Sequence, residues 1–408
     1  MSMKRIMMIA VLTAMLGGSR FCATAYAAVT VTNVTCQQRY PWNGMVDIDY
    51  EIQSDQPDAL FWVYPKGTDN WLGKRVIMNT LSGDGATNAV GVGKHRMVWD
   101  AKTDMPKYHT KDMQVTLQVI ANAAKYLVID VSNGPTAPFY NLRYSSEPPD
   151  LNDDKCRTDE IWLRLVLPGT FMMGGGGAQK CQVTLTQPYY MAIFEITQKQ
   201  WENVMGNNPA ELKGDWRPVE RISYNDIRGA KLGAKWPSSH EVDSDSFMGV
   251  IRVKTALLWD LPTEAQWEYA CRAGTTTDLN IGKDVEASGW YDSSPNMCLV
   301  GRHNNNSGEN VRGYSGGTAP VGNYLPNSMG LYDMHGNVAE WCLDRYNTYM
   351  DTNPVTDPVG WSSGNNVVRG GAWQDNCYGC TSYRRWSLPA NDSSNLQGFR
   401  PVILPFDE

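Results

Sequence analysis

One stretch in the C-terminal half of the chain carries the strongest signal about its architecture: Met329-Gly330-Leu331-Tyr332-Asp333-Met334-His335-Gly336-Asn337-Val338-Ala339-Glu340-Trp341. It places the carboxylates of Asp333 and Glu340 seven residues apart, with Gly336 at a turn between them. This spacing can fold a loop around a hard cation through side-chain and backbone oxygens. In the structural alternative, Glu340 pairs with a buried arginine and Asp333 caps a turn.

Three further motifs accompany this stretch, in a fixed order along the chain. They are Gly169-Thr170-Phe171-Met172-Met173-Gly174, Leu261-Pro262-Thr263-Glu264-Ala265-Gln266-Trp267-Glu268-Tyr269-Ala270, and Val368-Arg369-Gly370-Gly371-Ala372-Trp373 followed by Gly398-Phe399-Arg400. Together the four segments resemble the sulfatase-modifying factor family, whose founding activity is the formylglycine-generating enzyme. The resemblance covers about residues 126 to 404 and implies a C-type-lectin-like core with little regular secondary structure.

The resemblance also implies a calcium site and a copper site. Calcium would be bound by the side chains of Asp333 and Glu340 and by the backbone carbonyls of Gly336 and Val338. In the formylglycine-generating enzyme, two cysteines with four residues between them follow the Gly-Gly motif and bind copper.

The copper motif is incomplete in this chain. Cys380 falls on the second cysteine, whereas the first cysteine's position is Asp375 and the active-site serine's position is Ala372. In one hypothesis, Cys377 and Cys380 are the copper thiolates of an oxidase that converts the cysteine of a sulfatase peptide to formylglycine. In the alternative, they are structural cysteines, joined by a disulfide to each other or to other cysteines.

Aromatic residues suggest a recognition surface in the same region. The chain has 15 Trp and 20 Tyr against 8 Phe, a balance that favours rings with a polar group. Loops carrying such rings on a rigid scaffold are typical of carbohydrate or peptide recognition. The candidate ligand-binding residues are Trp373, Tyr378, Tyr383 and Trp386. The alternative is that these rings fill the core.

The N-terminus has the pattern of a secretory signal peptide. Lys4-Arg5 precede an apolar run from Ile6 to Gly18, and Ala25-Tyr26-Ala27 forms the cleavage site, so residues 1–27 are expected to be removed. The apolar run is too short to span a bilayer, and no later stretch is long enough. We therefore expect a periplasmic or secreted protein with no integral membrane span.

Charge and cysteine content fit this expectation. Cleavage removes three basic residues and no acidic ones, which takes the formal net charge from −7 to −10 and disfavours a nucleic-acid partner. It also leaves eight cysteines, an even number that permits disulfides in an oxidising compartment.

The chain divides into a β-rich part and a mixed part. Residues 28–123 alternate apolar and polar side chains over Val29–Thr32, Met45–Ile52 and Met113–Val119, which predicts a small immunoglobulin-like β-sandwich. Residues 124–160, rich in Pro, Asn, Asp and Ser, are predicted to connect it to the family domain at 161–408.

Two capping boxes in the second part predict helices. One opens at Thr197 and ends at Gly206, and the other opens at Thr263 and ends at Gly274. After residue 275 the pattern indicates mostly loop.

The expected fold class is therefore α+β, with a lectin-like domain of low regular secondary structure after an all-β domain. The expected function is an exported, divergent or non-catalytic family member with a calcium-bound core that binds a protein or carbohydrate ligand. The alternative is the copper-dependent oxidase.

Overall fold

The computed structural model describes residues 29–41, 43–71, 74–76, 78, 80–86, 88–105, 112–121, 125–177, 179–286, 289, 293–308, 310, 313, 316–347 and 352–404. The predicted signal peptide lies outside these residues. The chain forms two compact units: unit 1 ends at Lys125 and includes Tyr144–Ser146, and unit 2 holds Tyr126–Arg143 and the chain from Glu147 onward.

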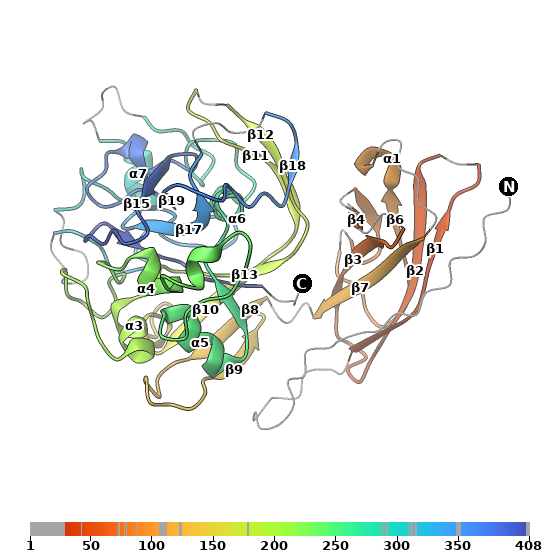
Figure 1. Ribbon diagram of the computed structural model, residues 1–408, viewed down its shortest axis with the longest axis horizontal. Helices are drawn as coiled ribbons and strands as arrows, with labels where there is room; N and C mark the ends of the chain where they lie inside the picture. Colours follow the sequence, from red (N-terminus) through yellow and green to blue (C-terminus); the bar gives the residue numbers. More distant parts are fainter. Residues whose placement is uncertain are drawn as a thin grey trace. The chain divides into compact units, whose positions relative to one another are not determined.

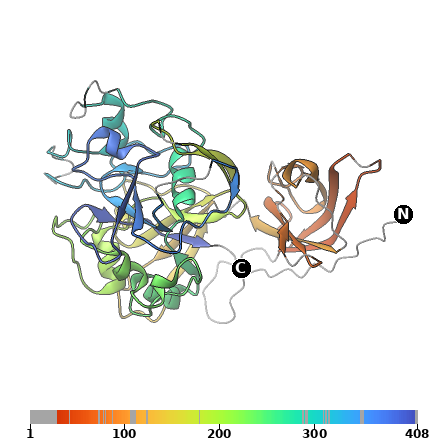
Figure 2. The same cartoon turned by 45° about the horizontal axis from the view of Figure 1, so that its top comes forward.

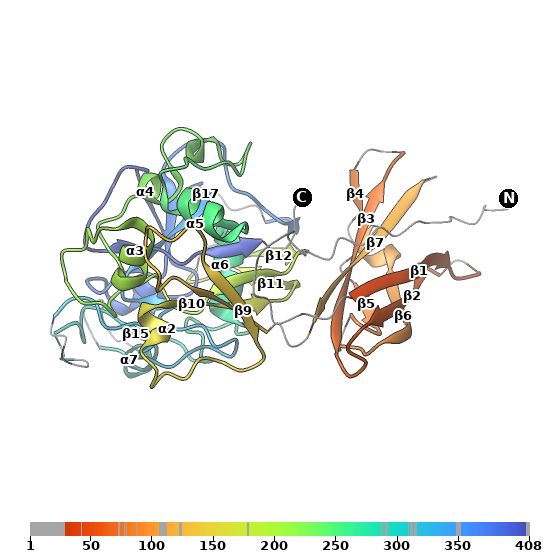
Figure 3. The same cartoon turned by 90° about the horizontal axis from the view of Figure 1, so that it is seen from below.

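Unit 1 consists of two β-sheets, as the alternating pattern predicts. One sheet has the order β1-β2-β6-β5 and the other β4-β3-β7, and Figure 3 shows the two as separate layers. The strands are β1 (Val29–Gln38), β2 (Met45–Ser54), β3 (Phe61–Asp69), β4 (Lys74–Val76), β5 (Leu81–Gly83), β6 (Gly93–Asp100) and β7 (Met113–Ala121), with a short helix α1 (Ala101–Asp104) after β6. Buried side chains from both sheets, such as Ile48 and Val63, form one core.

Unit 2 is built around a six-stranded sheet of order β14-β22-β13-β10-β8-β9. Its strands are β8 (Tyr126–Asp130), β9 (Asn141–Ser145), β10 (Glu160–Val166), β13 (Tyr189–Ala192), β14 (Leu258–Asp260) and β22 (Val402–Leu404). Part of the stretch predicted as a connecting segment thus forms β8 and β9. β9 alternates exposed and half-buried residues and so carries little apolar signal, whereas β8 is apolar and buried.

Three smaller sheets complete unit 2. Their orders are β11-β12-β18, β15-β16 and β20-β19-β17-β21. The strands are β11 (Gly169–Met173), β12 (Cys181–Leu185), β15 (Gly301–Arg302), β16 (His335–Gly336), β17 (Ala339–Arg345), β18 (Val355–Thr356), β19 (Asn366–Arg369), β20 (Arg385–Leu388) and β21 (Gln397–Gly398). The C-terminal part is thus less irregular than expected, because remote segments pair there. Its blue strands cross the middle of unit 2 in Figures 1 and 2.

Short helices connect and cover these sheets. They are α2 (Lys155–Thr158), α3 (Gln198–Met205), α4 (Tyr224–Arg228), η2 (Gly233–Lys235), α5 (Phe247–Thr255), α6 (Glu264–Arg272), α7 (Pro295–Val300) and η3 (Cys377–Cys380). The two predicted capping boxes are confirmed at Thr197 and Thr263, where each hydroxyl accepts a hydrogen bond from the backbone N–H three residues later. Helix α6 reaches its left-handed cap at Ala273, one residue before the predicted Gly274.

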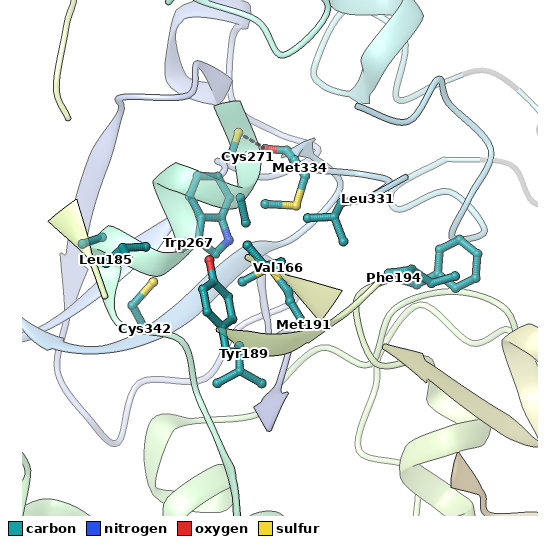
Figure 4. Packing of buried hydrophobic residues seen from close by; sticks show 14 of the residues in the cluster. Val166, Leu185, Tyr189, Met191, Phe194, Trp267, Cys271, Leu331, Met334 and Cys342 are labelled. Carbon is teal, nitrogen blue, oxygen red and sulfur yellow. Dashed lines mark hydrogen bonds between the residues drawn. The ribbon is translucent and has the colours of Figure 1, made fainter. Parts of the chain in front are cut away.

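The main core of unit 2 surrounds α6. Figure 4 shows Trp267 among Tyr189, Val166 and Cys342, with the Cys271 thiol donating to the Met334 carbonyl oxygen. Leu331 and Met334 anchor the stretch Met329–Trp341 in this core, and residues 333–341 are all buried. Among the described residues, no helix has both the length and the apolar composition needed to cross a membrane.

Candidate functional site

A two-glycine turn after β19 positions the candidate site. Gly370 and Gly371 have backbone φ values of +85° and +71°. A Cβ atom on Gly371 would lie 2.7 Å from the Gly379 carbonyl oxygen and 2.8 Å from Cys380 Sγ. Glycine is therefore required there for both its conformation and its lack of a side chain. The turn brings η3 directly against the end of β19.

Asp375 closes the loop between this turn and η3. Its carboxylate Oδ2 accepts a hydrogen bond from the Ala372 N–H at 2.8 Å, and its own N–H donates to the Ala372 carbonyl oxygen at 2.9 Å. Burial raises the pKa of the Asp375 carboxyl. The position expected for the first copper cysteine is thus held by a carboxylate tied to the position expected for the serine.

Cys377 and Cys380 stand at the two ends of η3, and both are fully buried. They pack in a small apolar cluster with Leu279, Met297 and Val300. The Cys380 thiol contacts the Ala372 carbonyl oxygen at 3.8 Å, and burial raises the pKa of this thiol well above its usual value. In its reduced form, Cys380 is therefore a protonated thiol rather than a thiolate at neutral pH.

His335 holds η3 in place through its imidazole ring. Its Nδ1 lies 2.7 Å from the Cys380 carbonyl oxygen and its Nε2 lies 3.1 Å from the Asn280 nitrogen. Nε2 must accept from the Asn280 N–H, so Nδ1 carries the proton and donates, and the ring is neutral. Burial lowers the pKa of His335 to about 4, in agreement with this assignment.

Glu340, a predicted calcium ligand, lies in an arginine pair. Its carboxylate accepts from Arg400 at 2.8 Å (Nη2 to Oε1) and 3.1 Å (Nε to Oε2), and from Trp267 Nε1 at 2.7 Å. Both oxygens therefore have donors, which is the structural alternative named from the sequence. Calcium binding by Glu340 stays a prediction, and in this structure Arg400 and Trp267 are the donors to its carboxylate.

Asp333 differs from Glu340 because one of its oxygens is unused. Asp333 Oδ2 accepts from the Gly322 N–H at 2.6 Å, whereas the buried Oδ1 has no hydrogen-bond partner among the described residues. Burial raises the pKa of Asp333 to about 6. Of the four predicted ligands, Gly336 lies in β16 and Val338 directly precedes β17.

Glu195 is a buried acid that the sequence analysis missed. It accepts hydrogen bonds from Asn337 Nδ2 at 2.6 Å and from the Val338 N–H at 3.1 Å. Burial, and next the charge of Asp333, raise its pKa well above the usual value. A single acid within the apolar run Met191-Ala192-Ile193-Phe194-Glu195-Ile196 was the available signal. Glu195 thus anchors the loop predicted to bind calcium.

Comparison with known proteins identifies the family of this chain. The family described as "Sulfatase-modifying factor enzyme 1-like domain" matches residues 150–404. The chain belongs to the sulfatase-modifying factor family. The resemblance drawn from the four motifs is therefore confirmed.

Relatives within the sulfatase-modifying factor family carry different names. "Chaperone protein LppX" of Paenibacillus barcinonensis is 30% identical over 260 residues, which are 59% of this chain and 88% of the relative. The formylglycine-generating enzyme of Mus musculus is 32% identical, over 45% of this chain and 50% of the enzyme. That of Thermomonospora curvata is 35% identical, over 59% of this chain and 70% of the enzyme. Among solved structures, "Treponema denticola variable protein 1" aligns with a TM-score of 0.47 and 24% identity, over 60% of this chain and 96% of that one. The match thus spans half of the mouse enzyme's length.

The four candidate aromatic residues of this family member differ in exposure. Trp373 is half-buried and donates from Nε1 to the Asn395 carbonyl oxygen at 2.9 Å. Tyr378 packs against the apolar cluster around η3, and Tyr383 lies over the turn at Gly175, where a Cβ would be 2.7 Å from its ring. Trp386 is 39% exposed. The structure therefore leaves one of the four rings at the surface.

Trp386 has a cationic neighbour. The guanidinium of Arg384 lies 4.3 Å from the centroid of the Trp386 ring, within the range of a cation–π contact. Trp386 belongs to β20, which pairs with β19 and is the outermost strand of its sheet. The exposed Trp386 ring on β20 and the half-buried Arg384 just before this strand thus form an aromatic and cationic pair.

A buried ionic network, also missed from the sequence, holds β19 and β20 on α6. Arg369 pairs with Glu268, which also accepts from Arg272 at 2.8 Å. Arg385 donates to both oxygens of Glu264 at 2.5 and 2.7 Å. Because these charges are paired and almost fully buried, the network fixes the strand that carries Trp386.

Proposed function

We propose that this chain is an exported, ligand-binding member of the sulfatase-modifying factor family that does not oxidise cysteine. The observation that carries the proposal is Asp375. A carboxylate hydrogen-bonded to Ala372 takes the place where the copper enzymes have their first sulfur. Soft thiolates select Cu(I), whereas carboxylates favour hard cations, so one sulfur and one carboxylate make a poor Cu(I) site.

The alternative is the copper-dependent oxidase acting on a cysteine of a sulfatase peptide. Its support is that Cys377 and Cys380 share one short helix. Against it, Cys377 is fully buried in the cluster with Leu279. A substrate thiol would also have to reach two sulfurs that are fully buried in this structure.

Cu(I) titration of the reduced full chain under anaerobic conditions separates the two functions. The readout is the thiolate-to-copper absorbance of the wild type and of Cys377→Ala, Cys380→Ala and Cys271→Ala, the last being a control for a buried thiol elsewhere. We expect no tight one-to-one binding that depends on Cys377 and Cys380. Tight binding lost in both of these variants and kept in Cys271→Ala would instead establish a copper site and refute the proposal.

We infer that Trp386 and Arg384 form the recognition surface for a protein ligand. A flat ring stacked with a guanidinium suits peptide side chains, including aromatic and acidic ones. The name of the relative LppX, a chaperone, favours a protein partner over the carbohydrate that the sequence also allowed.

The surface is tested with a displayed random peptide library selected on the full chain. For a selected peptide, we expect Trp386→Ala to weaken binding about tenfold or more and Trp386→Tyr to retain part of the affinity. Trp361→Ala is the matched control, since Trp361 is 57% exposed in the same unit. Equal binding by Trp386→Ala and the wild type would refute this surface. A parallel glycan array tests the carbohydrate alternative.

Export is part of the proposal and has a direct test. Expression with the native N-terminus, followed by N-terminal sequencing of the mature protein, is expected to show a chain that begins at Ala28. An uncleaved chain retained with the cytoplasmic fraction would contradict export.

A further inference from the structure

Cys377 and Cys380 are free thiols in this structure, but their spacing on one helix is compatible with a disulfide. They are the first and last residues of η3, a 3₁₀-helix. Because this helix has three residues per turn and rises about 2 Å per residue, side chains three positions apart point the same way, about 6 Å apart along the axis. That separation lies within the Cα–Cα range of disulfides.

The surroundings of η3 hold this geometry. The Asn376 side chain accepts a hydrogen bond from the Gly379 N–H at 2.9 Å and so caps the turn. The Cys380 carbonyl oxygen is held by His335, and Cys380 itself is pressed against Gly371. Both cysteines lie in one apolar cluster with no exposed surface. These contacts fix the turn, and both of its cysteines pack in the same apolar cluster.

The other four buried cysteines of unit 2, Cys156, Cys181, Cys271 and Cys342, belong to the main core and not to the cluster around η3. Cys181 contacts the Asn353 carbonyl oxygen at 3.0 Å, Cys271 that of Met334 at 3.8 Å, and Cys342 that of Glu340 at 3.9 Å. Each of these contacts belongs to a different segment of the chain. They serve as internal controls for oxidation that is not specific to η3.

We propose that Cys377 and Cys380 form a disulfide in the exported protein, and this rests on the export proposed above. Two thiols are oxidised and one external disulfide is reduced: Cys377–SH and Cys380–SH form Cys377–S–S–Cys380, while a small-molecule disulfide becomes two thiols that take up both protons. Because the folded chain buries both sulfurs, the bond forms before or during folding. The bond ties the two ends of η3 together, and the chain continues from there to the strand of Trp386.

Refolding in a defined thiol–disulfide buffer tests the bond separately from export. The full chain is reduced and unfolded, refolded with glutathione and glutathione disulfide, acid-quenched, alkylated in denaturant and digested with trypsin. Cleavage after Arg369 and Arg384 releases one peptide, residues 370–384, that contains both cysteines and no others. We expect this peptide to escape alkylation and to weigh two hydrogen atoms less than its reduced form, even in about tenfold excess of reduced glutathione.

The controls distinguish a specific bond from general oxidation. The peptides holding Cys271 and Cys342 should be alkylated throughout, and Cys377→Ala should leave Cys380 alkylated. Alkylation of both Cys377 and Cys380 in the refolded wild type, or linkage of either to another cysteine, would overturn the proposal. The same peptide taken from protein isolated after expression reports on export: a bond formed on refolding but absent there points to a reducing compartment.

Discussion

At the scale of single residues, Glu340 and Arg400 decide how the most distinctive stretch of the sequence is held. The pair is fully buried, and Arg400 also donates to the carbonyl oxygens of Ala192 and Tyr332. Removing one partner of a buried pair leaves an uncompensated charge, which is costly.

Glu340→Gln is expected to lower the free energy of unfolding by about 3–5 kcal/mol, measured by urea denaturation. Because Arg400 and Trp267 donate to both carboxylate oxygens, the loss should be the same with calcium and with a calcium chelator. Glu340→Asp, which keeps the charge, is the matched variant and should lose less. A loss seen only when calcium is present would support the calcium prediction instead.

His335 predicts an acid-sensitive stability. Its pKa is lowered to about 4 by burial, below the ordinary value of about 6.5. Between these values the unfolded chain takes up a proton and the folded chain does not, so the stability contributed by His335 is complete above about pH 6.5 and falls as pH drops toward 4. The slope is up to about 1.4 kcal/mol per pH unit.

The measurement is urea denaturation of the wild type and His335→Asn at several pH values. The side-chain amide of this variant can still donate to the Cys380 carbonyl oxygen, yet it does not titrate. We expect the stability difference between the two proteins to shrink as pH falls from 6.5 to 4. A difference that stays constant over this window would show that His335 does not cause the acid sensitivity.

At the scale of elements, helix α6 organises unit 2. The backbone N–H of Glu264, the first residue of α6, donates to Asp344 Oδ2 of β17 at 2.6 Å. Its side chains Glu264 and Glu268 hold Arg385 and Arg369 of β20 and β19. One nine-residue helix thus ties together the sheet beside the candidate site.

Asp344 gives this junction a pH dependence of opposite sign to that of His335. Burial and then the Glu264 carboxylate raise the pKa of Asp344 to about 7, so the folded chain holds a proton that the unfolded chain has released. Stability should therefore fall as pH rises from about 4 to about 7. Asp344→Asn keeps an oxygen that accepts from the Glu264 N–H but does not titrate. Urea denaturation of this variant at several pH values should therefore show no such fall in stability between pH 4 and 7. An unchanged series would contradict the assignment.

At the scale of the whole molecule, the two units have separate hydrophobic cores. The core of unit 1 includes Ile48, and the main core of unit 2 includes Leu331, both fully buried. Domains with their own cores are expected to unfold as separate cooperative units.

Differential scanning calorimetry of the full chain should therefore resolve two transitions. Ile48→Ala should shift one and Leu331→Ala the other, each with a loss of about 2–5 kcal/mol, because each leaves a cavity in one core. Movement of both transitions by either substitution would show that the units unfold together.

Much of the architecture was predictable from local patterns. Alternation over Met45–Ile52 and Met113–Val119 predicted β2 and β7, the capping boxes at Thr197 and Thr263 predicted α3 and α6, and the ordered motifs predicted the family. These signals depend on neighbours a few residues apart, whose preferences act before any tertiary contact forms.

What the amino-acid sequence determined alone is therefore the family and the fold class. Only the tertiary structure decided how the residues of the candidate site are used: Glu340 pairs with Arg400, 60 residues away, and Glu195 holds Asn337, 142 residues away. It also turned Asp375 back onto Ala372 and buried both cysteines of η3. The reason is physical, because a side chain's charge state and partner depend on which remote segments meet around it, and local sequence does not encode that meeting.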